Sequence, residues 1–392
     1  MHILIMPSWY KSSPGEVLGS FFEEQARALQ KKGHQVGIQF QIFYPASEIF
    51  KKRKAQPGYV NDNGLPTFIY TVQGIIPRSR KFNDAYETFF SERIFKKYVK
   101  KFGMPDIIHA HSVFHAGIFG LHLSKKFNIP LVITEHLTHY ITGRLSLVDD
   151  IPQAINVFKN AECSLVVGSV FKNELSKAVN LPENTFGVVS NMVSDLFFKD
   201  IKEKKYTQGE EFIFFTNSFL NARKNHILIF DSLKVIIDKG YNVKLIVGGG
   251  GEAESDLKEY VKNNSLQKNV YFTGILSRIE VKENIDHCHA FLLASTYETF
   301  GVVLIEALAG GKPIITTDSG GPKDIVKTDK IGILLKSFEV EEFVGAMESV
   351  IVNYENYKQK EISKYAADIF SEDVIAHQLI DIYTRLIKNK HK

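Results

Sequence analysis

The chain of 392 residues is 44% hydrophobic and 23% charged with a net charge of +4, a composition that is ordinary for a globular protein and excludes an intrinsically disordered one. Its length is too great for a single typical core and fits two domains of roughly 200 residues. The two cysteines indicate neither a disulfide framework nor a cysteine-based metal site. No run approaches the roughly 18 apolar residues of a membrane span, so no transmembrane helix is expected.

The first half of the chain alternates strands and helices. The strand at 2–6 lacks the basic flank and the long apolar core of a signal peptide, so we expect a protein of the reducing cytoplasm. The predicted elements that follow are loop 7–19, helix 20–32, strand 35–43, a basic irregular stretch, helix 83–102, strand 106–110, helix 113–127, strand 131–134, helix 151–160, strand 164–167 and strand 186–189. This alternation is typical of a parallel sheet with helices on both faces.

The basic stretch gives the first half an uneven charge. Residues 51–101 contain 12 Lys or Arg against four Asp or Glu, and aromatic side chains interleave with the cations. One interpretation is a solvated, variable insertion. The other is a face that is drawn to the anionic phosphates of a membrane surface, and the two stay open.

A second alternating region begins after residues 196–211, which are rich in charge and read as a linker. It predicts strands at 212–216, 243–247, 269–273, 290–294, 313–316 and 331–334, with helices at 225–238, 253–263, 278–288 and 301–310. The pattern beyond Ser337 is helical, and the last helix has Ser371 as its N-cap and an amphipathic stripe. We therefore predict an α/β chain with domains at 1–196 and 197–370 and a final helix at 371–392.

Two predicted loops are rich in glycine. The loop 7–19 ends in Gly15 and Gly19, which would let the backbone approach a phosphate or a sugar closely. The run Gly248–Gly251 is a second loop of this kind, but the acidic helix start after it would repel a pyrophosphate. A dinucleotide site is therefore not expected there.

Histidines end two successive predicted strands. His111 closes strand 106–110, and His136 follows the next strand after Thr134 and Glu135. Active-site groups of α/β folds gather at the carboxyl ends of strands, although a lone histidine there is more often structural. We expect one of the two histidines to meet a substrate.

Arg223 and Lys224 directly precede helix 225–238. Cations at a helix amino terminus oppose its dipole by about 0.3 to 1 kcal/mol each, and a bound diphosphate would reverse the sign of this effect. The alternative is a pair of exposed basic residues of little energetic importance.

The most informative stretch contains Glu298 and Glu306. Between Phe300 and Gly311 the only side chain that can be charged is Glu306, and a helix that is apolar on every face is normally buried. A buried carboxylate without a partner costs on the order of 2 to 7 kcal/mol, and no cation lies three or four residues away on the same helix. Either a basic residue from a distant segment or the hydroxyl groups of a ligand must satisfy Glu306. The stretch lies beyond the carboxyl end of strand 290–294, and this position favours a ligand over a distant cation. The amides of Phe300, Gly301 and Val302 would then form an anion site.

A metal site is not indicated. No two aspartates lie two positions apart, so the Asp-x-Asp arrangement that holds a divalent cation against a nucleotide diphosphate is missing. Cations and helix amides would then have to neutralise a departing diphosphate, and no cofactor is expected.

Together these motifs resemble the retaining GT-B glycosyltransferases of family 4. The most specific stretch is Tyr297-Glu-Thr-Phe-Gly-Val-Val-Leu-Ile-Glu-Ala307, followed by Gly310-Gly-Lys-Pro-Ile-Ile and Ser319-Gly-Gly-Pro322. The resemblance implies two Rossmann-like domains facing a cleft, an amino-terminal one for the acceptor and a carboxyl-terminal one for the donor, and a last helix that packs back on the amino-terminal domain. Ser218 departs from the pattern, since family members often have Arg there.

The resemblance also implies residue roles. Glu298 would contact hydroxyls of the donor sugar, Glu306 the ribose of its nucleotide, and His111 would lie beside the transferring sugar. The other donor-binding residues that it implies are Gly19, Arg223, Lys224, Leu276 near the base, Thr299, Phe300, Gly301 and Val302.

The implied activity is that of a retaining, metal-independent hexosyltransferase. It would move a sugar from a UDP- or GDP-sugar to a polysaccharide or lipid-linked saccharide in bacterial surface glycan synthesis, at the inner face of the membrane and without nucleic acid. Preorganised positive groups would stabilise the departing diphosphate while the acceptor hydroxyl attacks from the same face. Two alternatives stay open: a non-catalytic or complex-dependent partner subunit with this fold, and a nucleotide-sugar epimerase.

Overall fold

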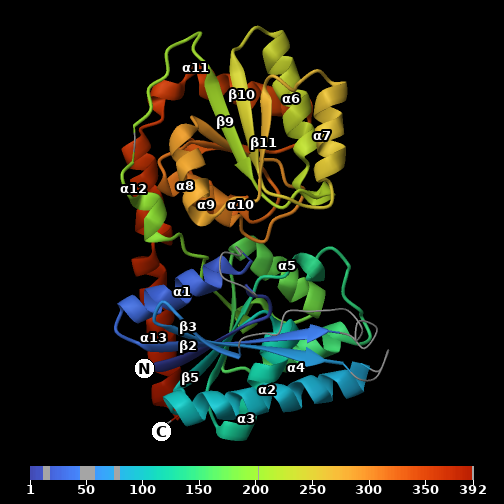
Figure 1. Ribbon diagram of the computed structural model, residues 1–392, viewed down its shortest axis with the longest axis vertical. Coiled ribbons are helices and arrows are strands. Elements are labelled where there is room, and N and C mark those ends of the chain that lie inside the picture. Colours follow the sequence, from blue (N-terminus) through green and yellow to red (C-terminus); the bar gives the residue numbers. More distant parts are fainter. Residues whose placement is uncertain (12–17, 45–57, 75–79, 202, 391–392) are drawn as a thin grey trace. The chain divides into compact units, whose positions relative to one another are not determined.

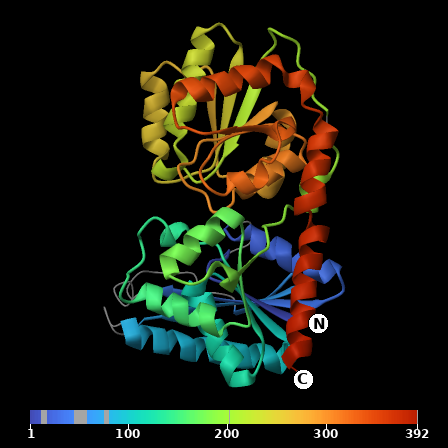
Figure 2. The same cartoon turned by 180° about the vertical axis from the view of Figure 1, so that it is seen from behind.

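The computed structural model describes residues 1–11, 18–44, 58–74, 80–201 and 203–390. These residues form two compact units, and in each of them helices flank a central sheet on both faces (Figures 1 and 2). The first unit comprises Met1–Val167, Lys172–Val189 and Ala376–Lys392, and the second unit comprises Gly168–Phe171 and Ser190–Ile375.

The described part of the first unit contains a sheet in the order β3-β4-β2-β1-β5-β6-β7-β8. Every neighbouring pair is parallel except β3 with β4, which is antiparallel. The strands are β1 (His2–Pro7), β2 (Gln35–Tyr44), β3 (Gly58–Asp62), β4 (Leu65–Gln73), β5 (Ile107–His111), β6 (Leu131–Glu135), β7 (Cys163–Val166) and β8 (Phe186–Val188). The central strands β1, β5 and β6 are buried along their whole length, as expected for parallel strands that helices cover on both faces.

Helices of the first unit connect these strands. They are α1 (Ser20–Lys31), α2 (Arg80–Phe102), α3 (Ile118–Phe127), α4 (Asp150–Asn160) and α5 (Ser169–Val179), with the single turns η2 (Val113–Gly117), η3 (Thr138–Tyr140) and η4 (Glu183–Thr185). The helix predicted at 113–127 is thus interrupted, because η2 is a wider turn in which His115 has a positive φ of 67°.

Two further predictions for the first unit were incomplete. The stretch between 44 and 82 was expected to be irregular, but it contains β3 and β4, joined at Asn63 and Gly64, which both have positive φ angles. An Asn-Gly pair between β-forming runs is a strong hairpin signal. Helix α5 was not predicted, although two parallel strands such as β7 and β8 require a crossover connection.

The second unit has a purely parallel sheet in the order β11-β10-β9-β12-β13-β14. Its strands are β9 (Phe212–Asn217), β10 (Val243–Gly248), β11 (Val270–Gly274), β12 (Ala290–Leu293), β13 (Ile314–Thr317) and β14 (Gly332–Leu335). Its helices are α6 (His226–Asp238), α7 (Glu254–Asn263), α8 (Arg278–His287), α9 (Val302–Ala309), α10 (Pro322–Ile325), α11 (Val340–Val352) and α12 (Gln359–Phe370), with short turns η5 (Asp195–Phe198), η6 (Ala222–Lys224), η7 (Asp329–Ile331) and η8 (Tyr354–Asn356).

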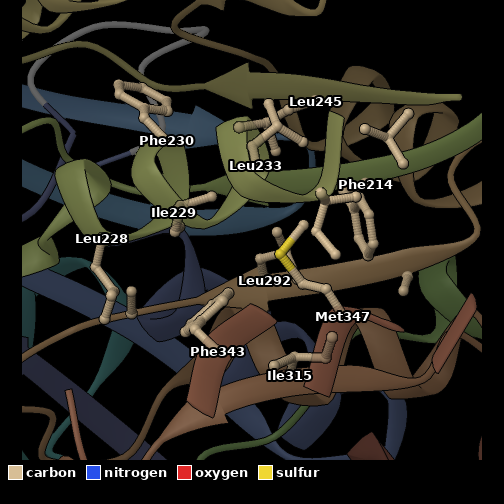
Figure 3. Packing of buried hydrophobic residues seen from close by; sticks show 14 of the residues in the cluster. Phe214, Leu228, Ile229, Phe230, Leu233, Leu245, Leu292, Ile315, Phe343 and Met347 are labelled. Atoms are coloured by element: carbon tan, nitrogen blue, oxygen red, sulfur yellow. The ribbon is translucent and has the colours of Figure 1, made fainter. Parts of the chain in front are cut away.

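The hydrophobic core of the second unit lies between its sheet and the helices α6 and α11. Figure 3 shows Leu233 of α6 and Met347 of α11 beside Phe214, Leu245 and Leu292 of the sheet. All five side chains are buried, and each such side chain stabilises the folded state by about 1.5 to 3 kcal/mol. This core supports the strands whose carboxyl ends carry the predicted site.

The last helix, α13 (Glu372–Lys390), belongs to the first unit from Ala376 onward. Ser371 accepts a hydrogen bond from the amide of Val374 and so acts as its N-cap. The Tyr383 hydroxyl lies 2.6 Å from Nδ1 of His109, and Lys390 forms a 3.0 Å ion pair with Glu162. The helix therefore packs on the amino-terminal domain, and both chain ends lie in that unit (Figure 2). Among the described residues, no helix combines the length and the apolarity of a membrane span.

Candidate functional site

The loop that carries Glu298 is held in place by the glycines that follow β13. The amide of Glu298 donates to the carbonyl of Ser319 at 2.7 Å, and the amide of Gly321 donates to the carbonyl of Glu298 at 2.8 Å. A side chain at Gly321 would collide with the backbone of Phe300. The Ser319-Gly320-Gly321 segment is therefore needed to fix the loop between β12 and α9.

The Glu298 carboxylate is surrounded by cationic and hydroxyl groups. Its Oε1 atom contacts the Lys224 ammonium, accepts a 2.7 Å hydrogen bond from the Ser295 hydroxyl, and lies 3.6 Å from the guanidinium of Arg223. Burial alone would raise the pKa of Glu298, but the charges of Lys224 and Arg223 outweigh it and the pKa is lowered. Glu298 is consequently a carboxylate at neutral pH and accepts hydrogen bonds rather than donating a proton.

Arg223 and Lys224 reach Glu298 because β9 and β12 are neighbours in the sheet, so the loops at their carboxyl ends adjoin. Arg223 donates to the carbonyl of Tyr297 at 2.7 Å, and its own carbonyl accepts the amide of Thr296 at 2.8 Å. The two cations form the turn η6 directly before α6. Their unfavourable position at a helix amino terminus is thus compensated in part by Glu298.

The glycine run after β10 packs against the loop before these cations. A side chain at Gly249 would collide with the carbonyl of Ser218, and one at Gly251 would collide with the carbonyl of Leu220. The close approach that the four glycines permit is therefore to the backbone of the neighbouring loop. Leu276, after β11, is nearly buried and lies beside Gly248.

Glu306 has a cationic partner from another segment. The guanidinium Nη1 of Arg278 lies 2.5 Å from Oε1 of Glu306, and its carbon atom lies 4.7 Å above the Phe197 ring. The expectation that ligand hydroxyls alone satisfy this carboxylate is thus wrong for one oxygen, because α8 brings Arg278 to it. The other oxygen, Oε2, is buried and has no hydrogen-bond partner among the described residues.

The start of α9, directly after Glu298, leaves several backbone donors without a bond among the described residues. Gly301 has a positive φ of 104° and precedes the first helical residue, Val302. Within the described part of the chain, the amides of Thr299, Phe300, Gly301 and Val302 donate no hydrogen bond. They form the amino-terminal group of donors that suits an anion.

In the first unit the predicted His111 lies in a cluster of neutral polar side chains. Its Nδ1 atom is 3.0 Å from Nε2 of His136, and its Nε2 atom is 3.3 Å from the amide nitrogen of Gln25. His109 joins the cluster through the same amide nitrogen, at 3.3 Å, and through the Thr134 hydroxyl, at 2.8 Å. Burial, with the neighbouring histidines adding to it, lowers the pKa of His111 well below its usual range, so the imidazole stays neutral.

Gly19 is the N-cap of α1, with a φ of 73°, and a side chain there would come within 2.9 Å of the Trp9 carbonyl. It is required for the turn itself. The other glycine of the predicted loop, Gly15, lies outside the described residues, as does part of the basic 51–101 stretch.

Sequence reasoning missed two members of the site, Arg278 and Ser295. Arg278 is the first residue of α8, which begins with a capping box formed by Ser277 and Glu280. It is therefore another cation at a helix amino terminus, the signal that marked Arg223 and Lys224. Ser295 lies three residues before Glu298, and nothing in its local sequence distinguishes it.

Comparisons with known proteins cover most of the chain. The family described as "Glycosyl transferases group 1" matches residues 197–368, and "Glycosyltransferase Family 4" matches residues 18–195. An uncharacterized glycosyltransferase of Methanocaldococcus jannaschii is 30% identical over 66% of this chain and 69% of its own length. The alpha-monoglucosyldiacylglycerol synthase of Streptococcus pneumoniae is 23% identical over 68% of this chain and 64% of its own.

Among solved structures, Anabaena HepE in complex with UDP and glucose superimposes with a TM-score of 0.73. The match covers 98% of this chain and 99% of that one, at 18% identity. At this identity the likeness establishes a shared GT-B fold of two Rossmann-like units.

Proposed function

We propose that this protein transfers a sugar from a UDP- or GDP-sugar to a saccharide or a lipid-linked saccharide. The transfer would retain the configuration of the sugar and would need no metal. The chain belongs to the group 1 glycosyltransferases of family 4 and is therefore a glycosyltransferase. The second unit would bind the donor. The single observation that carries this proposal is the unpaired, buried Oε2 atom of Glu306.

A buried acceptor without a donor costs about 1 to 3 kcal/mol. Arg278 pairs with Oε1 of Glu306 and leaves Oε2 without a partner among the described residues. Glu306 lies on α9, and Glu298 lies in the loop that leads into this helix. A ribose hydroxyl donates one hydrogen bond and would satisfy Oε2 without displacing Arg278. The arginine then orients the carboxylate rather than competing with the nucleotide.

The diphosphate of the donor would bind between Arg223, Lys224 and the unpaired amides at the start of α9. In the unliganded chain Glu298 neutralises Lys224. An incoming diphosphate would share this cation, and a sugar hydroxyl would take over as a partner of Glu298. Positive groups that are already in place would stabilise the diphosphate as it leaves, which is usually the largest catalytic contribution of such a site.

Because the pKa of Glu298 is lowered, this residue would not protonate the leaving group. His111, buried and neutral, is equally unsuited as an acid. The leaving phosphate would instead take the proton of the acceptor hydroxyl, which attacks from the same face of the sugar. Glu298 would hold the sugar while it carries positive charge.

The acceptor would belong to bacterial surface glycan synthesis at the inner face of the membrane. Two observations support this location. The relative from Streptococcus pneumoniae is named for a glycolipid product. On α2 the exposed Phe82 and Phe89 share one face with Arg93, Lys96 and Lys100, a combination that suits an anionic lipid surface.

The proposal is tested by calorimetric titration of the protein with a panel of UDP- and GDP-sugars, in buffer that contains EDTA. We expect one nucleotide sugar to bind, and Glu306→Gln to weaken its binding about tenfold through loss of one charged acceptor. Glu348→Gln, at the exposed ion pair with Lys239, is the matched control. If no nucleotide sugar binds, or if Glu306→Gln binds as tightly as the control, the proposed donor site is wrong.

A further inference from the structure

The layer between β2 and α2 in the first unit changes from apolar to polar along the strand. Alternate residues of β2 face the helix. Gly37 makes room for the ring of Tyr98, whereas Gln39 and Gln41, further along, face Ser91 and Glu87. A layer between a sheet and a helix is normally apolar, so buried polar side chains in this half of the layer are unusual.

The two glutamine amides have a fixed orientation. Nε2 of Gln39 donates to the backbone carbonyl of Ser91 at 3.0 Å, and Nε2 of Gln41 donates to the backbone carbonyl of Glu87 at 3.2 Å. A carbonyl only accepts, so the amide nitrogens must point at α2 and the oxygens must point away. Both Oε1 atoms are buried and have no hydrogen-bond partner among the described residues.

Glu87 adds a carboxylate to these oxygens. Its side chain is buried, with 4% of its surface exposed, and its Oε2 atom accepts no hydrogen bond from the residues that the structure describes. Nδ1 of His115 lies 3.3 Å from this atom. One turn earlier on α2, the Oδ1 atom of Asn83 is likewise buried and without a partner in the described chain.

His115 is held in this place by an unusual backbone. It has φ 67° and ψ −74° within η2, and Ser112 before it has φ 66°. Residues other than glycine rarely adopt a positive φ, and such backbone strain concentrates at functional sites. The turn places the half-exposed His115 ring beside the buried Glu87 carboxylate.

The two glutamines line a small opening, together with Ser91 and His115 and with Pro7 at the carboxyl end of β1. Glu87 is not among the residues that line it and lies beside His115. Its free volume of about 10 Å³ suits one group of the size of a water molecule or a hydroxyl. Because the unpaired atoms are all acceptors, the missing group must be a donor. A phosphate or a carboxylate is therefore excluded.

We propose that Gln39 and Gln41 form a binding site for a hydroxyl group of the acceptor saccharide, with His115 at its rim and Glu87 beside His115. This inference rests on the proposed glycosyltransferase function and specifies which residues of the first unit recognise the acceptor. A hydroxyl at the edge of a sugar ring enters the opening and donates to the oxygens that have no partner. These residues select the acceptor and take no part in bond breaking.

Saturation-transfer NMR with methyl α-glucoside, methyl α-galactoside, methyl α-mannoside and N-acetylglucosamine tests the site without a donor. We expect at least one of these sugars to bind the intact chain. Gln41→Met removes one unpaired oxygen, and Glu87→Gln changes the partner of His115 at the rim, so each lowers the binding about fivefold or more. Gln35→Met is the matched control, because Gln35 lies on the same face of β2 and bonds to Phe102 at the other end of α2.

If none of the four sugars binds, or if Gln41→Met and Glu87→Gln bind as well as Gln35→Met, the inference is overturned. A rise in thermal stability of both variants with unchanged sugar binding also overturns it, since the opening then holds water only. Titration of the same variants with the nucleotide sugar separates the two proposals. If the variants still bind the nucleotide sugar but no longer bind the saccharide, the acceptor site is supported. If the unmutated chain binds a saccharide but no nucleotide sugar, only the donor site is refuted.

Discussion

The second unit gathers charges at its candidate site, whereas the histidine cluster of the first unit, at the ends of β5 and β6, is neutral. In the second unit, Lys224 pairs with Glu298 and Arg278 pairs with Glu306. In the described part of the first unit, His109 and His111 are buried without a counter-ion, and burial holds the pKa of both below the usual range. The contrast supports the two proposals, because fixed cations suit the diphosphate of a donor and neutral polar groups suit hydroxyl groups.

The largest expected effect tests the charged side of this contrast. Lys224→Met removes the cation that contacts Glu298 and leaves Arg223, 3.6 Å away, as its nearest charge. Loss of one preorganised group that stabilises a leaving anion lowers turnover by about 10² to 10³. Initial rates of sugar transfer at saturating donor measure this effect.

Lys239→Met is the control for Lys224→Met, because Lys239 is a surface residue that pairs with Glu348 on α11. It should retain full turnover. Turnover of Lys224→Met within about twofold of this control would mean that the positive charge at η6 has no role in catalysis.

A second prediction concerns the stability of the same unit. Arg278→Met leaves the Glu306 carboxylate buried with neither oxygen paired, and removing one partner of a buried ion pair costs about 3 kcal/mol. The double variant Arg278→Met with Glu306→Gln removes the charge and should regain part of that stability. Unfolding in urea measures both, and a loss below about 1 kcal/mol for the single variant would mean that water already satisfies Glu306.

How much of this contrast could be read from the sequence depends on how local each feature is. The two glutamates, the start of α9 and the Ser319–Gly321 loop lie within 24 residues, so their pattern is visible in the chain. The partner of Glu306 is 28 residues away, on α8. Whether a buried acid is paired by a distant cation is decided by tertiary packing, which periodicity does not reveal.

In the first unit, the strand-end position of His111 and His136 predicted that they would lie on adjacent strands, and β5 and β6 are indeed neighbours. The polar layer of Gln39, Gln41 and Glu87 was not predicted, because it arises from the register of β2 against α2. The hairpin at Asn63 and Gly64 could have been predicted, but the high charge of residues 51–101 suggested an irregular stretch.

The neutral side of the contrast predicts a pH dependence of stability. The pKa of His109 is lowered to about 3 by burial, with His136 contributing, whereas in the unfolded chain it is near 6.5. Between these values the unfolded state binds more protons, so stability is complete above pH 6.5 and is lost as the pH falls. From pH 7 to 5, His109 alone accounts for a loss of about 2 kcal/mol.

Unfolding in urea at pH 7, 6 and 5 measures this dependence. His109→Asn should flatten the slope, because it removes the buried imidazole. If the slope of His109→Asn equals that of the intact chain, His109 is not responsible for the acid sensitivity.

The smallest expected effect concerns the positive charge on the surface of the first unit. Lys100 lies on the exposed face of α2 that also bears Phe89, and 57% of the surface of Phe89 is exposed. Each cation near an anionic lipid surface contributes about 1 kcal/mol, so Lys100→Ser should weaken sedimentation with phosphatidylglycerol vesicles about fivefold and leave phosphatidylcholine vesicles unaffected. Lys330→Ser, at an exposed site of the second unit, should change neither. Equal losses in both variants would show that net charge alone governs adsorption, and the membrane face of α2 would have to be abandoned.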